Sequence, residues 1–482
     1  MRNQIFIIAA VIATALPAFA QKAMSRGDLV RYAFKNSETL AQLEAERERI
    51  IYMRKEYYGK ALPDVNGALN YVLAPNLNGG NSSDNKESPP SATETIGGMS
   101  QAGLADAGDM ALAQYVDGLS EGLKKIGEGL SAMSGKNTFQ WEVKANQVIF
   151  AQGKVKTGLR IADIALETID EQYKNEKLTL SQKIMDAYNS ALLAQQNAVI
   201  QQDALIIAEE SYRIAKARFE TGKGSALDTL NARYEQQQAV SRLRAAKKAQ
   251  KLAIEALATT ASLDDSQITL TDSLVVPGFD LTEEAAWGKM QENNSSLKLL
   301  SQAKILQTQQ TNLVKSDYLP MIGAFASIGQ HNLFDTGDEF AEADKWKWDC
   351  KIGVGVQVPI FNGGQRKNKL HQAKLEELKL DKKETEARRG LRLALSAAFE
   401  DLAVAREELA RTNQMIALTE QGLRISKLAF ELGQITQLEL NNTEQNNRGA
   451  KLAHNNAVFE INSAVINIEK LIGSENLISI GN

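Results

Sequence analysis

The sequence predicts a mainly α-helical protein with some β structure, in which long coiled-coil helices continue into a transmembrane β-barrel that receives four strands from each chain. Three observations support this prediction. Only 8 of the 482 residues are proline, and none lies in residues 91–276 or 360–482, so long uninterrupted helices are allowed there. The chain also contains two copies of one pattern. Within each copy, the spacing of apolar residues changes between a period of 3.5 and a period of 2.

A secretory signal peptide is predicted over residues 1–20. Arg2 is followed by the apolar stretch Ile5–Leu16 and then by Ala18–Ala20, whose small-x-small pattern is typical of a cleavage site before Gln21. A membrane anchor is the alternative, but this apolar stretch is shorter than the ~20 residues that a spanning helix needs. We therefore expect the mature protein to begin near Gln21.

The ionisable residues argue against several classes of function. Lys and Arg (55) nearly balance Asp and Glu (59), and no dense basic tract appears, so nucleic acid is not an expected partner. Cys350 is the only cysteine, and His331, His371 and His454 lie too far apart for metal-ligand spacing. No catalytic constellation is recognisable either. We therefore expect no enzyme activity, no cofactor and no metal site.

The duplication is visible in short motifs. Leu62-Pro63 recurs 257 residues later as Leu319-Pro320, whereas Phe219–Gly222 recurs 211 residues later as Phe430–Gly433. The first copy therefore carries 46 extra residues, an insertion that must fall within about 74–137.

The predicted organisation follows from these repeats. We expect a first structural repeat over residues 21–260, a strand-and-loop junction over 261–282, a second repeat over 283–473 and a C-terminal tail over 474–482. Within the insertion, apolar residues at helical spacing over Ala111–Met133 predict an amphipathic helix.

Two long helices are predicted in corresponding parts of the repeats. Between Gly153 and Phe219 the apolar residues follow a 3.5-residue period, and the same register recurs 211 residues later. This period is typical of a coiled coil, whereas an ordinary amphipathic helix departs from a strict heptad within a few turns. Such a helix would extend ~100 Å, far beyond the diameter of a globular domain. Shorter helices are expected over Arg26–Gly59, Ala226–Thr260, Glu284–Lys315 and Thr436–Gly473.

Strands are predicted where the apolar period changes to 2, over residues about 63–73, 138–149, 320–331 and 346–360. Each has apolar side chains on one face and charged or small ones on the other, as transmembrane β-strands do. A soluble sheet with one buried face alternates in the same way, so the pattern alone leaves both alternatives open. Four strands cannot close a barrel around a lumen, so several chains must contribute. The residues that suit an aromatic girdle at a membrane interface are Trp141, Trp346 and Trp348.

The order of these motifs resembles the TolC family of outer-membrane efflux proteins. The resemblance rests on the duplicated helix–strand–strand–helix unit, on Leu-Pro before the first strand of each copy, on Phe361–Gln365 after the last strand, and on Phe-x-x-Gly at the far helical ends. It implies a homotrimer with one shared β-barrel in outer-membrane lipid and a periplasmic helical tunnel. It also implies a passive exit duct for efflux or type I secretion. The implied partners are a periplasmic adaptor, or membrane fusion protein, and an inner-membrane pump of the RND, ABC or MFS type.

The same resemblance implies a location in the outer membrane of a Gram-negative bacterium. The insertion at about 74–137 would then lie outside the cell, because it separates two strands at the end opposite to the long helices. There it would be a tolerated loop or a lid over the exit.

The helical tips hold the site residues that the resemblance implies. Gly222 and Gly433 are the turn glycines, and polar groups that close or line the periplasmic aperture follow six and nine residues later. These groups are Asp228, Asn231, Glu439 and Asn442, of which Asn442 departs from the carboxylate of the best-known members. Leu227 and Leu438 lie beside them and would contact the adaptor.

A purely structural role is the alternative for the two acids. Asp228 and Glu439 each lie in the first turn of a predicted helix, where a negative charge is favourable, and Ser225 and Thr436 precede them as caps. The two roles are compatible. For the whole chain, the alternative function is a soluble periplasmic coiled-coil interaction protein or adhesin.

Overall fold

The computed structural model describes residues 22–72, 137–263, 268–334, 340 and 342–474. The predicted signal peptide, the helix expected over Ala111–Met133 and nearly all of the insertion and the C-terminal tail lie outside these residues. The chain divides into two compact units. The helical unit contains Met1–Arg49, Leu166–Gln302 and Leu380–Asn482, and the sheet unit contains Ile50–Ala165 and Ala303–Lys379. Each unit therefore combines segments of both predicted repeats.

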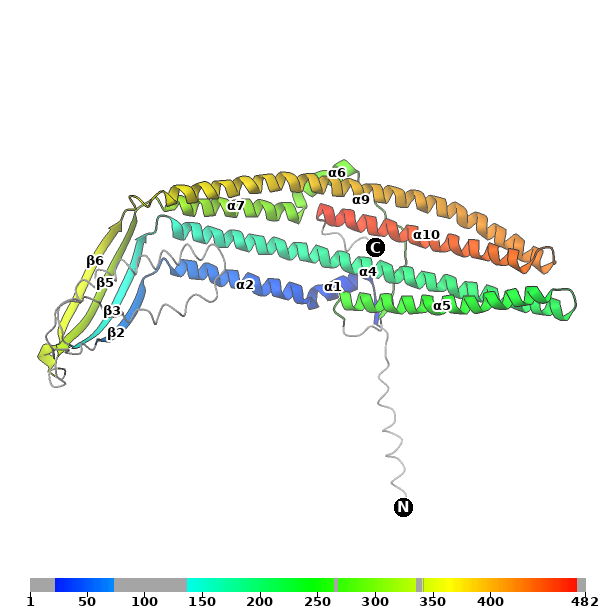
Figure 1. Cartoon of the computed structure of the whole chain (residues 1–482), viewed down its shortest axis with the longest axis horizontal. Helices are drawn as coiled ribbons and strands as arrows, with labels where there is room; N and C mark the ends of the chain where they lie inside the picture. Colours follow the sequence, from blue (N-terminus) through cyan, green and yellow to red (C-terminus); the bar gives the residue numbers. More distant parts are fainter. Residues whose placement is uncertain (1–21, 73–136, 264–267, 335–339, 341, 475–482) are drawn as a thin grey trace, which may run out of the picture. The chain divides into compact units, whose positions relative to one another are not determined.

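The sheet unit contains a four-stranded antiparallel sheet in the order β2-β3-β5-β6 (Figure 1). The strands are β2 Asp64–Val72, β3 Asn137–Phe150, β5 Met321–Phe334 and β6 Lys347–Gln357. All begin and end within three residues of the strands expected from the sequence. β6 begins after Trp346, which follows the short 3₁₀ helix η1, Ala343–Lys345. It ends before Pro359, because proline has no N–H to donate to a neighbouring strand.

The strand register places most of the large apolar residues of the four strands on one face of the sheet, with Phe325 as an exception on the other face. Leu69 of β2 lies opposite Trp141 of β3, and the same row reaches Trp348 of β6 across β5. Leu69 is 70% exposed and Trp348 is 65% exposed, so the sheet unit leaves this face open. A row on the opposite face is polar and consists of Asn66, Lys144, Ser327 and Lys351.

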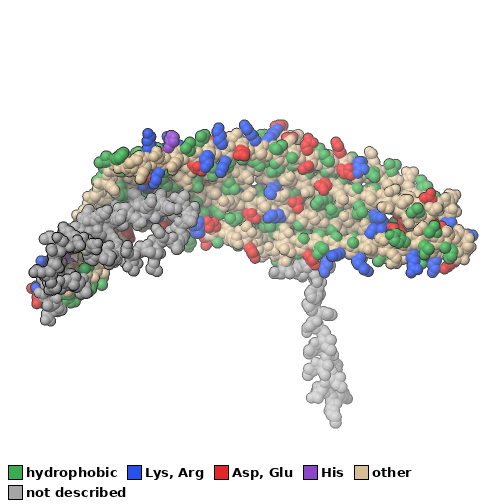
Figure 2. Space-filling view, in the orientation of Figure 1, with side chains coloured by type: hydrophobic (Ala, Val, Ile, Leu, Met, Phe, Trp, Pro, Cys, Tyr) green, Lys and Arg blue, Asp and Glu red, His purple; other side chains and the backbone are tan. Residues whose placement is uncertain are grey.

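Two long helices have equal lengths. α4 covers Lys154–Glu220 and α9 covers Gln365–Glu431, so each has 67 residues and the two are offset by 211. The helices that follow them are α5 Ala226–Thr260 and α10 Gln437–Ile472, which begin at the same offset. Charged side chains of both signs are scattered over the visible helical surfaces (Figure 2). Among the described residues, no helix combines the length and the apolar character needed to cross a bilayer.

The helices expected over Arg26–Gly59 and Glu284–Lys315 are each broken once. The observed elements are α1 Arg26–Asn36, α2 Glu38–Gly59, α6 Glu283–Asn293 and α7 Ser295–Ser316. The breaks fall at Ser37 and Asn294, which have extended backbones and lie 257 residues apart. At each break a side-chain oxygen accepts a hydrogen bond from the backbone three residues later, at 3.4 Å for Ser37 and 3.1 Å for Asn294. These polar residues cap the next helix, so the chain changes direction without glycine or proline.

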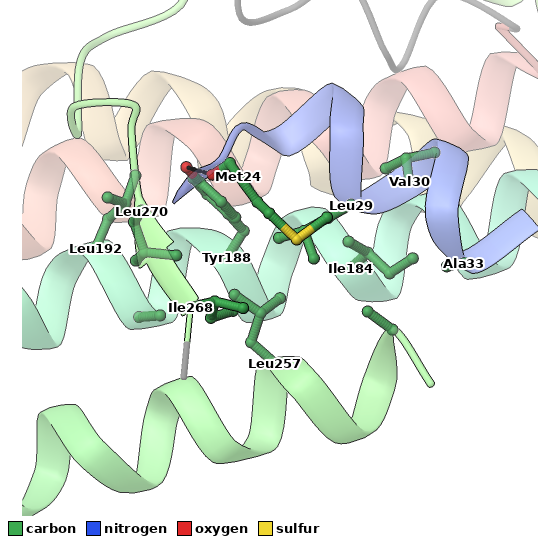
Figure 3. Close-up of a cluster of buried hydrophobic side chains, with 12 residues drawn as sticks. Met24, Leu29, Val30, Ala33, Ile184, Tyr188, Leu192, Leu257, Ile268 and Leu270 are labelled. Carbon is green, nitrogen blue, oxygen red and sulfur yellow. Dashed lines mark hydrogen bonds between the residues drawn. The ribbon is translucent and has the colours of Figure 1, made fainter. Parts of the chain in front are cut away.

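The helical unit contains the apolar core shown in Figure 3, where β1 Lys22–Met24 and α1 pack against α4 and the end of α5. β1 pairs in parallel with β4 Ile268–Leu270. A second cluster joins α6, α9 and α10. Fully buried members of the two clusters include Leu29, Ile184, Tyr188, Leu257, Met290, Leu395 and Ile468.

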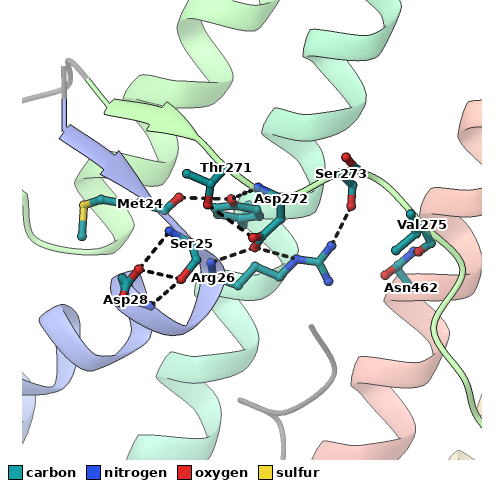
Figure 4. Close-up of polar contacts among 10 residues, drawn as sticks. Met24, Ser25, Arg26, Asp28, Thr271, Asp272, Ser273, Val275 and Asn462 are labelled. Atoms are coloured by element: carbon teal, nitrogen blue, oxygen red, sulfur yellow. Dashed lines mark hydrogen bonds and ion pairs between the residues drawn. The ribbon is translucent and has the colours of Figure 1, made fainter. Parts of the chain in front are cut away.

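Polar contacts fix the start of α1 to the junction after β4 (Figure 4). The Arg26 backbone N–H donates to the Asp272 carboxylate at 3.0 Å, and the Arg26 guanidinium donates to the Ser273 carbonyl at 3.3 Å. The Tyr188 hydroxyl donates to the Met24 carbonyl and accepts from the Asp272 N–H, both at 3.2 Å. Burial lowers the pKa of Arg26, and the Asp272 carboxylate opposes this effect. The first described residues of the chain are therefore held firmly against the junction between the repeats.

Candidate functional site at the helix tips

Two turns join the helices of the helical unit at their far ends (Figure 1). Residues 221–225 connect α4 with α5, and residues 432–436 connect α9 with α10. Gly222 has φ 71° and Gly433 has φ 76°, a left-handed backbone that favours glycine because it has no Cβ. In both turns a backbone N–H reaches back five residues, from Lys223 to the Arg218 carbonyl and from Gln434 to the Ala429 carbonyl, at 2.8 Å each. The two glycines therefore end the long helices by the same motif.

Arg218 connects the two turns. Its guanidinium donates to the Phe430 carbonyl at 2.5 Å and to the Lys223 carbonyl at 3.4 Å, and it lies 5.4 Å from the centre of the Phe430 ring. A Cβ on Gly433 would lie only 2.5 Å from the Arg218 Nη2 atom. The turns pack over an apolar cluster of Ala215, Ala232, Leu423, Phe430 and Leu440.

The predicted acids make different contacts. Glu439 forms a capping box with Thr436, whose backbone N–H and hydroxyl donate to its carboxylate at 2.7 and 3.0 Å. These hydrogen bonds lower the pKa of Glu439. The Asp228 carboxylate of α5 instead accepts a hydrogen bond at 3.4 Å from the backbone N–H of Gln437, the first residue of α10. Ser225 caps α5 and Asp228 lies in its first turn, so the structural role suggested for both acids is present. Asp228 also joins α5 to the start of α10.

The other predicted tip residues differ in exposure. Asn231 is half-buried and Asn442 is exposed. Leu227 and Leu438 are 63% and 59% exposed, although each lies in the first turn of its helix. Exposed leucines at two corresponding positions form an apolar surface on each tip.

A partly buried charge cluster lies between the α4–α5 and α9–α10 helix pairs and was missed by sequence reasoning. Glu444 of α10 accepts a hydrogen bond from the Ser211 hydroxyl of α4 at 3.2 Å. Glu235 of α5 contacts Arg242 and lies 3.7 Å from Arg448 of α10. Burial raises the pKa of Glu444 to about 7 and lowers the pKa of Arg448. The cluster ties α4, α5 and α10 together through groups that are costly to bury.

The sheet unit holds the predicted tryptophans. Trp141 and Trp348 lie on the apolar face with ring centres 5.9 Å apart, and the Trp141 indole N–H donates to the Gln330 side chain at 3.3 Å. Trp346 precedes β6 and packs against Phe139, with ring centres 5.5 Å apart. The described ranges contain no group of three or more His, Cys, Asp or Glu residues arranged to hold a metal ion.

Comparison with known proteins identifies relatives of this chain. The family model described as outer membrane efflux protein matches residues 118–262 and 266–474. The chain is 24% identical over 208 residues to the alkaline protease secretion protein AprF of Pseudomonas aeruginosa, an alignment that covers 42% of each protein. It is 24% identical over 273 residues to the outer membrane efflux protein BepC of Brucella suis, which covers 55% of this chain and 56% of BepC. The chain thus aligns with about half the length of these curated relatives.

A solved structure has the same fold over almost the whole chain. CusC, a protein studied for its folding and transmembrane channel formation, superposes with a TM-score of 0.71 over 93% of this chain and 92% of CusC, at 12% identity. This likeness confirms the predicted fold class. The family match covers well over half of the residues in both repeats. The chain therefore belongs to the outer membrane efflux protein family.

Proposed function

We propose that three copies of this chain form an outer-membrane channel that serves as the exit duct of an efflux or type I secretion system. The observation that carries this proposal is the sheet, which has one open apolar face and one polar face and continues into helices of 67 residues. The apolar face fits lipid, and the polar face fits a water-filled lumen. The alternative of a soluble adhesin is disfavoured because it leaves the apolar face in water.

Trimer formation follows from the edges of the sheet. β2 and β6 are edge strands whose outer backbone groups have no partner in the described sheet. Hydrocarbon cannot satisfy these groups, so the sheet must close with strands from other copies. Three copies would supply twelve strands, as the family resemblance implies.

The tips are proposed as the periplasmic aperture. Glu439 is exposed and its pKa is lowered, so it is ionised near neutral pH. Three copies would form a ring of negative charge, and Asp228, Asn231 and Asn442 would add polar groups near it. Movement of α4 and α5 away from α10 would break the Asp228 to Gln437 hydrogen bond and widen the opening.

The partners are proposed on two grounds. The exposed Leu227 and Leu438 give an adaptor apolar side chains to contact on both tips. The names of the relatives refer to secretion of a protease and to efflux, which are tasks that need an energised inner-membrane pump. An adaptor and a pump of the RND, ABC or MFS type would therefore open the aperture and drive the cargo.

The test combines assembly and conduction. The mature protein, extracted from outer membranes in mild detergent, should have the mass of three copies by native mass spectrometry. Inserted in planar bilayers, the trimer should conduct ions, because its lumen is continuous. A stable monomer that releases freely from the periplasm would contradict the proposal and favour the adhesin.

A further inference from the structure

The chain segments beside one end of the sheet carry a high positive charge. Residues 50–63, 151–165, 303–320 and 358–379 contain thirteen Lys and Arg but only five Asp and Glu, a net charge of +8. The whole chain has a net charge of −4, so the remaining residues carry −12. Each segment adjoins a strand at the sheet end where β2 and β5 begin and where β3 and β6 finish. Positive charge is therefore concentrated at this end.

Helix stability does not account for this charge. Among the other described helices, α1, α2, α5, α6 and α10 have an acid in the first turn, as the helix dipole favours, and α7 has none. α4 and α9, which begin at the sheet, have no acid in their first turns. They carry Lys156 and Lys367 there instead, 211 residues apart and thus present in both copies. A cation at this end of a helix is unfavourable, so these lysines point to an external anionic partner.

Four of these lysines are exposed and have no partner among the described residues. Lys156, Lys367, Lys369 and Lys374 make no ion pair with a described carboxylate. By contrast, Lys154 is buried and lies 2.7 Å from Asp317. Figure 2 shows Lys and Arg side chains along the exposed edge of the first part of α9. We call the four exposed lysines together with Arg366 the basic collar.

The basic collar adjoins the apolar face of the sheet. Val354 and Val356 of β6 are exposed on that face, and beyond the strand Ile360 is 91% exposed and Phe361 is 84% exposed. Arg366 follows five residues later. Its guanidinium donates to the Pro359 carbonyl at 2.9 Å and lies 5.7 Å from the centre of the Tyr318 ring. Along the chain, exposed apolar residues are thus followed directly by basic residues. The same order is found at the boundary between the hydrocarbon core and the headgroups of a membrane.

We propose that the basic collar binds the anionic phospholipid headgroups of the leaflet on the helix side of the membrane. This inference rests on the proposed function, which places the apolar face of the sheet in hydrocarbon. The collar then lies at the level of the headgroup phosphates, where lysine heads reach anions while their stems cover apolar surface. Each basic residue near an anionic membrane increases binding by about fivefold. Two helix starts per chain, in three chains, surround the barrel with such groups.

The experiment compares two triple variants of the full-length trimer. K156Q/K367Q/K374Q removes three charges from the collar, and K223Q/K247Q/K248Q removes three exposed charges from the helical unit as a matched control. Native mass spectrometry in mixed micelles measures how many phosphatidylglycerol and phosphatidylcholine molecules each trimer retains.

We expect the wild type and the control to prefer phosphatidylglycerol by about tenfold at low salt, and high salt to weaken this preference because ions screen the charges. The collar variant keeps Lys369 and Arg366 and should show a preference for phosphatidylglycerol reduced several-fold from that of the wild type. An unchanged preference in the collar variant, or no preference in the wild type, would overturn the proposal.

Conduction in pure phosphatidylcholine bilayers separates this inference from the proposed function. A conducting wild type without lipid preference would reject the collar alone. A wild type that neither conducts nor retains either lipid would reject the channel itself.

Discussion

Glu439 accepts hydrogen bonds from the backbone and the side chain of Thr436, and this cap orients the carboxylate at the tip of α10. We expect Glu439→Gln to reduce the cation preference of the channel, because three charges disappear from a narrow opening. The trimer should still assemble, since a helix-terminal acid contributes only about 0.3–1 kcal/mol. Reversal potentials in asymmetric salt across a planar bilayer measure the effect, and Asp228→Asn should give a smaller change.

Thr436→Ala is the matched control, because it removes the hydroxyl of the cap and keeps the charge of Glu439. It should lower helix stability at the tip without changing selectivity. If Glu439→Gln and wild-type channels had the same ion selectivity, Glu439 would have only its structural role.

Glu444 makes the packing of the tips sensitive to pH. Burial raises its pKa from 4.5 to about 7, and the charge of Glu235 adds to this effect. The hydrogen bond from Ser211 and the positive charges of Lys427 and Arg448 act in the opposite direction. The packed hairpins therefore favour the protonated form. As the pH rises from about 4.5 to 7, the packed state should lose stability, by ~3 kcal/mol in total.

Glu444→Gln should remove this pH dependence, since glutamine keeps the Ser211 contact without ionising. Hydrogen exchange of the α10 amides at pH 5 and pH 8, corrected for intrinsic rates, should show wild-type protection falling at pH 8 and variant protection nearly constant. Glu420→Gln is the control, because Glu420 is 47% exposed and pairs with Lys451. An equal loss of protection in the wild type and Glu444→Gln would exclude Glu444 as the titrating group.

Sequence motifs located some tip residues but not others. Gly222 and Gly433 were found because both copies contain the same Phe-x-x-Gly motif. Arg218 was missed because its counterpart in the second copy is Ala429, so comparison of the repeats hides it. Glu444 was missed because its burial depends on how α4 packs against α10, which no local pattern contains. The proposed roles of the tip residues at the aperture remain predictions.

At the scale of the elements, helices that follow a strict period were predicted closely. The expected long helix from Gly153 to Phe219 corresponds to α4, Lys154–Glu220. The breaks at Ser37 and Asn294 were missed, since neither residue is a strong helix breaker and the caps that they form are single local hydrogen bonds. The pairing of β1 with β4 was also missed, because three residues are too few to show a period.

The break at Asn294 has a testable energetic role. Its side-chain amide donates to the Leu471 carbonyl at 2.8 Å near the end of α10, and its side-chain oxygen caps α7. We expect Asn294→Ala to cost about 1–2 kcal/mol and to increase hydrogen exchange at the start of α7 and the end of α10. Ser37→Ala should cost less, because Ser37 makes only the 3.4 Å cap contact. No change in exchange for Asn294→Ala would show that solvent replaces both contacts.

For the molecule as a whole, the family match confirms the resemblance to outer-membrane efflux proteins and the predicted outer-membrane location. The sequence could predict this because the duplication preserves the order of helices and strands even where individual residues differ. It could not predict the cargo, which depends on the partners and on the lumen of the proposed trimer.

The insertion between β2 and β3 should lie on the cell surface. Both strands meet it at the sheet end opposite to the basic collar and the helix starts. In a Cys350→Ser background, a cysteine introduced at Ser82 should react with a membrane-impermeant maleimide on intact cells. The background substitution is needed because Cys350 is exposed. A cysteine at Lys223 should react only after the outer membrane is permeabilised, and the reverse pattern would invert the proposed orientation.

The equal lengths of α4 and α9 restrict which insertions and deletions the two long helices can accept. Both helices have 67 residues and are followed at the same offset by α5 and α10. Seven residues added to one long helix alone would move its turn ~10 Å past the other turn and separate Arg218 from Phe430. Insertions and deletions should therefore be inherited in pairs, one in each half of the gene. An alignment of relatives should show length differences in the first long helix matched by equal differences in the second.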